Sequence, residues 1–76
     1  MTLAQLAVGK SGVIAAVGGE GALRCRLLDM GLIPRTEVTV QKMAPMGDPI
    51  QIRLRDYELT IRREDAEAIT LKEVRA

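Results

Sequence analysis

Apolar residues recur with a helical spacing in the middle of the first half of the chain. Leu23, Leu27 and Met30 lie four and three positions apart, which places them on one face of a helix. Gly31 follows at once and predicts the left-handed residue that ends this helix. Leu32 is then expected to fold back onto Leu27, the apolar contact of a Schellman motif.

Three further segments follow strand patterns. Residues 36–40 alternate with a period of two after Pro34, which prevents the helix from resuming. Residues 13–17 form a short apolar run that predicts an earlier strand, and Ile69 and Leu71 mark a last strand. The helix therefore falls between the first two strands.

Two apolar–polar alternations predict a hairpin within residues 50–62. Asp56–Tyr57 separates them and is expected to form the tight turn, which sets Arg55 opposite Glu58. The chain is thus mainly β, with about five short strands around an aliphatic core and one inserted helix. We expect a small barrel, in which closure protects the strand edges, over a single domain spanning residues 1–76.

Composition limits the possible functions. The 76 residues include one aromatic residue and no histidine, so the commonest general base is absent. Glu64, Asp65 and Glu67 cluster in a turn that begins like a helix, where acidic side chains favour the helix dipole. We therefore expect no catalytic residues, no enzyme activity and no cofactor.

Candidate metal ligands are few. Cys25, the only cysteine, and Asp29 lie four positions apart and share a helix face. Soft and borderline metals prefer thiolate and imidazole ligands, and two ligands make only a weak site. The sulfurs of Met30, Met43 and Met46 are interpreted as packing groups. No strong metal site is expected, and Cys25 and Asp29 are weak candidates.

Nucleic acid and membrane are poor partners for this chain. Acidic residues interrupt the arginines of the hairpin, and Tyr57 is the sole aromatic residue available for stacking on bases. The formal net charge is only +1, and the longest apolar run, residues 13–17, is far shorter than the roughly 20 residues that span a bilayer. With one cysteine and no signal peptide at its start, the chain is expected in the cytoplasm, without direct membrane insertion.

The connection at residues 43–49 is apolar where turns are usually polar. It contains Met43, Pro45 and Met46, and ends at Asp48–Pro49. Two interpretations are open: these side chains plug the end of a thin core, or they form a protein-binding patch of adaptable methionine and rigid proline. Both can hold, with Leu32 inside and Met46 outside.

Three motifs resemble those of a known family. Leu28-x-x-Gly31-Leu32-x-Pro34 is followed by Ala44-Pro45-x-Gly47-Asp48-Pro49-Ile50 and by Leu59-x-Ile61-Arg62. In this order and spacing they resemble the FeoA family of bacterial ferrous iron transport, over about residues 3–74. Asp56 departs from the glycine that many relatives have before the tyrosine, and aspartate tolerates a left-handed turn position.

The resemblance implies an SH3-like barrel and an accessory role in Fe²⁺ uptake. The implied partner is the cytosolic region of a FeoB-like transporter that carries a GTP-binding domain, so the protein is expected to associate with the membrane through its partner, as a monomer or weak oligomer. Alternatives are a transition-metal sensor or delivery protein, and a stand-alone version of the regulatory barrel of metal-dependent repressors. The candidate partner-binding residues are Arg26, Leu32, Pro34, Met43, Pro45, Met46, Asp48 and Tyr57.

Overall fold

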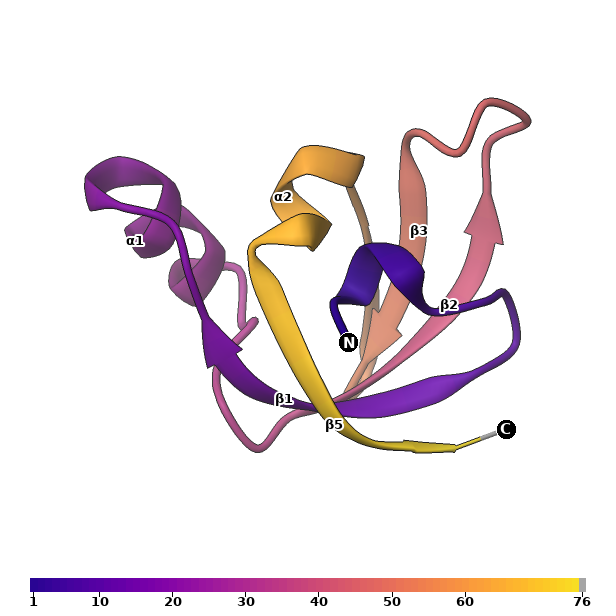
Figure 1. The fold of residues 1–76 in the computed structure, drawn as a ribbon, viewed down its shortest axis with the longest axis horizontal. Coiled ribbons are helices and arrows are strands. Elements are labelled where there is room, and N and C mark those ends of the chain that lie inside the picture. Colours follow the sequence, from indigo (N-terminus) through magenta and orange to yellow (C-terminus); the bar gives the residue numbers. More distant parts are fainter. Residues whose placement is uncertain (76) are drawn as a thin grey trace.

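The computed structural model describes residues 1–75. Its strands are connected by short segments, and three short helices lie around them (Figure 1). In chain order the elements are η1 (Leu3–Gln5), β1 (Ser11–Val17), α1 (Gly21–Asp29), β2 (Glu37–Met43), β3 (Ile50–Leu54), β4 (Tyr57–Ile61), α2 (Arg63–Glu67) and β5 (Ile69–Arg75).

The five strands form one antiparallel sheet in the order β4-β3-β2-β1-β5. β1 and β5 cross below the other elements, α1 lies to one side, and η1 and α2 cover the hollow of the curved sheet (Figure 1). The β2–β3 connection projects on the side away from α1. The predicted mainly β fold with one helix inserted after the first strand is confirmed, and α2 and η1 are added to it.

The core is aliphatic. Its fully enclosed members include Leu3, Ile14, Leu27 and Ile52, drawn from η1, β1, α1 and β3. Because one face of each strand supplies alternate apolar residues, the sheet presents a continuous apolar surface, and η1 and α1 close over it. The core therefore depends on every element being in place.

The end of α1 has the predicted Schellman geometry. Gly31 has φ 96° and donates its N–H to the Leu28 carbonyl at 3.0 Å. Leu32 donates to the Leu27 carbonyl at 3.1 Å, and both leucine side chains are fully buried. These two bonds satisfy carbonyls that the helix end would otherwise leave without partners.

The hairpin differs from its prediction in register. Tyr57 lies in β4 opposite Leu54, so Arg55 and Asp56 form the turn, and Glu58 faces Arg53 instead of Arg55. The left-handed residue of the turn is Arg55, with φ 53°. The predicted Asp56–Tyr57 turn was therefore wrong by one position, and the strand pairing by two.

Two other expectations also need correction. Met43 belongs to β2, where it pairs with Ile50, so the β2–β3 connection begins at Ala44. The predicted closure is also incomplete, because β4 and β5 are the two ends of the sheet order and no pairing joins them within residues 1–75. The barrel is open along this seam.

Candidate functional site

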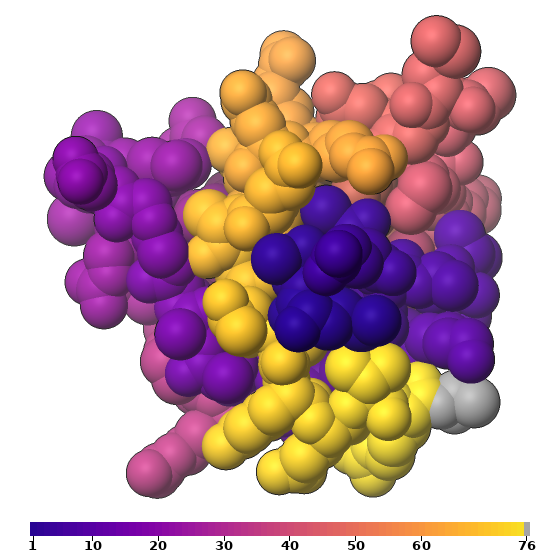
Figure 2. Space-filling view, in the orientation of Figure 1, coloured from indigo at the N-terminus to yellow at the C-terminus, as the bar shows by residue number. Residues whose placement is uncertain are grey.

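The hairpin tip, residues 44–49, connects β2 to β3. The Gly47 N–H donates to the Ala44 carbonyl at 2.7 Å, and the Ala44 N–H donates to the Pro49 carbonyl at 3.1 Å, which folds the tip into a compact loop. Met46 is 91% exposed, the largest exposure among the large apolar side chains. The tip projects at the upper right of the molecule (Figure 2).

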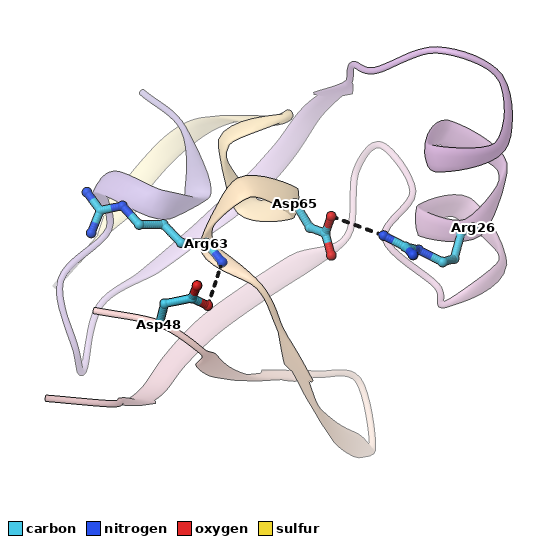
Figure 3. Close-up of polar contacts among 4 residues, drawn as sticks. All are labelled: Arg26, Asp48, Arg63 and Asp65. Carbon is cyan, nitrogen blue, oxygen red and sulfur yellow. Dashed lines mark hydrogen bonds and ion pairs between the residues drawn. The ribbon is translucent and has the colours of Figure 1, made fainter. Parts of the chain in front are cut away.

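The tip is fastened to α2 at its base. Asp48 Oδ1 accepts a hydrogen bond of 3.0 Å from the backbone N–H of Arg63, the first residue of α2 (Figure 3). A Cβ at Gly47 would lie 2.9 Å from Arg63 Nη1, so the glycine admits the arginine side chain. Asp48 thus satisfies an N–H that the helix leaves without a partner, and holds Met46 on a defined base.

A shallow hollow lies beside this base. It has a volume of about 380 Å³ and combines a proline ring and an isoleucine with polar and charged groups. Its lining residues are Asp48, Pro49, Thr60, Ile61 and Arg62. An exposed apolar projection next to an open hollow of mixed polarity suits contact with another protein surface.

Arg26 has a structural partner. Its Nη2 donates to Asp65 Oδ1 at 3.1 Å, which joins α1 to α2 (Figure 3). Asp65 is only 7% exposed, whereas the Arg26 side chain is largely exposed. A buried carboxylate without its cation is costly, so Arg26 contributes to the fold whatever else it contacts.

Tyr57 also has a structural partner. Its hydroxyl donates to the Met30 carbonyl at the end of α1, and a Cβ at Gly31 would lie 2.1 Å from the same hydroxyl oxygen. The ring remains 42% exposed. Tyr57 therefore ties β4 to the helix end and still offers one edge to the solvent.

The candidate partner-binding residues divide between two places. Pro45, Met46 and Asp48 belong to the hairpin tip, next to the start of β3, whereas Tyr57 lies opposite the end of β3. Four residues along a strand separate these ends by roughly 13 Å. The candidates therefore do not form one patch, and the tip is the more exposed of the two places.

Three other candidates take different positions. Leu32 is fully buried between α1 and the sheet, which removes it from any surface, and this corrects its assignment to the partner-binding set. Met43 is half-buried against the core, whereas Pro34 is exposed in the α1–β2 connection. The hollow has no signature in the sequence, because Thr60 and Arg62 reach Asp48 only through the pairing of β3 with β4.

The weak metal candidates lie together on α1. Cys25 and Asp29 are both exposed on this helix. Within residues 1–75, no group of three or more histidine, cysteine, aspartate or glutamate side chains is placed to hold a metal ion. Cys25 and Asp29 therefore gain no third ligand of these four types within residues 1–75.

None of the helices in residues 1–75 has the length and apolar character needed to cross a bilayer.

The fold is that of a small SH3-like protein. The FeoA of Stenotrophomonas maltophilia, described as a prokaryotic SH3 domain protein and solved in complex with zinc, superposes with a TM-score of 0.84 at 24% identity, over 95% of this chain and 89% of that chain. The model of the FeoA domain matches residues 1–73. The chain belongs to the FeoA family, whose members are accessory proteins of Fe²⁺ transport.

Two other relatives are more similar in sequence. The FeoA protein of Chlorobium tepidum is 39% identical with a TM-score of 0.85, over 93% of this chain and 68% of that chain. A fusion of Fe²⁺ transport protein A with the Fe²⁺ transporter FeoB, from Porphyromonas gingivalis, is 40% identical over 72 residues, or 95% of this chain. The chain corresponds to only 8% of the length of that fusion protein.

Metal-dependent repressors share the fold alone. IdeR of T. acidophilum superposes with a TM-score of 0.82 at 18% identity, over 95% of this chain and 33% of that chain. An identity this low indicates a common architecture, and the repressor alternative gains no functional support from it.

Proposed function

We propose that residues 1–76 act as one FeoA-like domain that docks on the cytosolic region of a FeoB-type Fe²⁺ transporter and regulates it. One observation carries this proposal: in the Porphyromonas gingivalis relative, a sequence 40% identical to this chain is joined to FeoB in a single polypeptide. Fusion keeps two proteins at a high effective concentration, which benefits partners that act together. The domain then works at the cytoplasmic face of the membrane, associated with it through the transporter.

The hairpin tip is the proposed contact surface. Met46 gains nothing from its exposed position in the isolated protein, and methionine adapts its shape to irregular partner surfaces. The Asp48–Arg63 hydrogen bond holds the tip in place before binding, which lowers the entropy lost on docking. Pro45 restricts the same loop further.

Regulation follows from unequal affinity for two states of the transporter. A domain that binds one conformational or nucleotide state more tightly shifts the equilibrium toward that state by its difference in binding free energy. No catalytic group is needed for this effect, in keeping with the accessory role of the family.

The experiment measures binding of the purified chain to the isolated cytosolic region of the transporter, in separate titrations with GDP and with a non-hydrolysable GTP analogue. The proposal expects saturable binding with different dissociation constants in the two titrations. Equal affinities would contradict regulation through the nucleotide state, and the absence of binding to the region in both titrations would contradict docking.

A further inference from the structure

The two edges of the open sheet are treated differently by the fold. The outer edge of β5 is covered by the start of the chain, where Thr2 pairs with Thr70 and the Leu71 N–H donates to the Met1 carbonyl at 2.7 Å. Glu73, with φ 52°, further interrupts the regular extension of β5. Such devices prevent an edge strand from pairing with another chain.

The outer edge of β4 has no such cover. The pair Leu54–Tyr57 closes the two-residue turn and exchanges backbone hydrogen bonds. In an antiparallel hairpin only every second pair does so, which leaves out the pairs that contain Glu58 and Thr60. The N–H and C=O of Glu58 and Thr60 consequently point away from β3. Among residues 1–75, no backbone hydrogen bond from another segment reaches these two residues.

We propose that β4 pairs antiparallel with β4 of a second copy of this chain, about a two-fold axis through Leu59. This register uses all five residues of β4, because Tyr57 lies opposite Ile61 of the second copy. Glu58 lies opposite Thr60, and both offer outward backbone groups, so each such pair exchanges two hydrogen bonds. The two sheets become continuous across the axis.

Side chains in this register support a second copy as the occupant. Asp56 lies opposite Arg62 of the second copy, and the symmetry repeats this pair of opposite charges. The two Leu59 side chains meet at the axis, where each is only partly buried in the single chain. A shift of the register that centres on Glu58 would instead set two glutamates against each other, which disfavours it.

The association is weak. Two strands of five residues bury far less than the roughly 1,200 Å² of a stable interface, and dissociation constants of about 0.1–1 mM are expected. Self-association of this strength appears when many copies are concentrated at one membrane. The second copy adds to the outer edge of β4, whereas the hairpin tip connects β2 and β3 on the inner side of β4, so dimerisation leaves the tip free.

Sedimentation equilibrium and amide hydrogen exchange of the intact chain test the proposal. Between micromolar and millimolar protein, the amides of Glu58 and Thr60 are expected to gain protection as dimers form. The amides of Leu59 and Ile61, which face β3, are expected to be protected at both concentrations. A protein that stays monomeric at 1 mM, or dimers without new protection at Glu58 and Thr60, would overturn the proposal.

Three variants make the test specific. Thr60→Pro removes only an outward N–H and should abolish dimers. Asp56→Arg should weaken dimerisation about tenfold, because two attractive pairs become repulsive, and adding Arg62→Asp should restore it. Glu20→Arg, the same charge change at an exposed residue outside β4, just before α1, is the control. Should Thr60→Pro fail to fold, the charge exchange decides: equal dimerisation of Asp56→Arg and Glu20→Arg would refute the register.

Discussion

Replacing Gly31 with a residue that carries a Cβ is expected to destabilise the protein for two separable reasons. The residue has φ 96°, and a left-handed conformation costs an L-residue about 1–2 kcal/mol. The new Cβ would also lie 2.1 Å from the Tyr57 hydroxyl oxygen and would break the hydrogen bond to the Met30 carbonyl, which contributes about 0.5–1.5 kcal/mol. Gly31→Ala should therefore lower the free energy of unfolding by about 1.5–3.5 kcal/mol.

Tyr57→Phe separates the two contributions. Without the hydroxyl, the nearest ring atom lies 3.4 Å from the new Cβ, an ordinary contact distance. In the Tyr57→Phe background the hydrogen bond is already lost, so Gly31→Ala should cost only the backbone strain, about 1–2 kcal/mol. The two substitutions are then coupled by about 0.5–1.5 kcal/mol.

Urea unfolding of the four proteins, followed by circular dichroism, gives this double-mutant cycle. Gly31→Asn and Gly31→Val extend it, since asparagine tolerates a left-handed conformation and valine does not, so valine should be the more damaging. If Gly31→Ala lowers the free energy of unfolding equally in the wild-type and Tyr57→Phe proteins, the contact with Tyr57 is refuted. Equal melting temperatures for the asparagine and valine variants would refute the left-handed helix end.

Two further substitutions and one metal titration also have defined expected results. Arg26→Met leaves buried Asp65 without its cation and should cost about 1–3 kcal/mol in urea unfolding, because the arginine side of the pair is exposed to solvent; an unchanged free energy of unfolding would mean that water replaces the arginine. Leu32→Ala should cost about 2–5 kcal/mol, because the side chain is fully enclosed, and an unchanged melting temperature would contradict that placement. Anaerobic calorimetry with Fe²⁺ should give weak binding or none, whereas a stoichiometric submicromolar site lost in Cys25→Ser would favour metal delivery.

Local signals predicted some features of the fold well. The Schellman end of α1 depends on residues within one turn of each other, so Gly31 and Leu32 were enough to predict it. The hairpin register could not be predicted from the apolar pattern, because a slip of two residues leaves Ile52 and Leu59 on the same face. The turn decides between the registers, through the left-handed conformation of Arg55.

The candidate site was predicted only in part. Exposure of Met46 follows from its place at a loop tip, which the sequence indicates. The Arg26–Asp65 pair and the Asp48–Arg63 hydrogen bond join segments 39 and 15 residues apart, and such contacts have no local signature. Tyr57 and the hairpin tip were therefore named in one set of candidates, although the strand pairing sets them at opposite ends of β3.

The most direct test of docking through the hairpin tip is to measure melting and binding on the same variant, Met46→Asp. A charge at a 91% exposed position costs almost nothing in the free protein, whereas a charge desolvated in an apolar interface costs several kcal/mol. Val8→Asp, at another exposed apolar residue, is the matched control. We predict unchanged melting temperatures for both variants, and a large loss of binding to the transporter's cytosolic region for Met46→Asp alone. A folded Met46→Asp variant that binds normally would contradict docking through the tip.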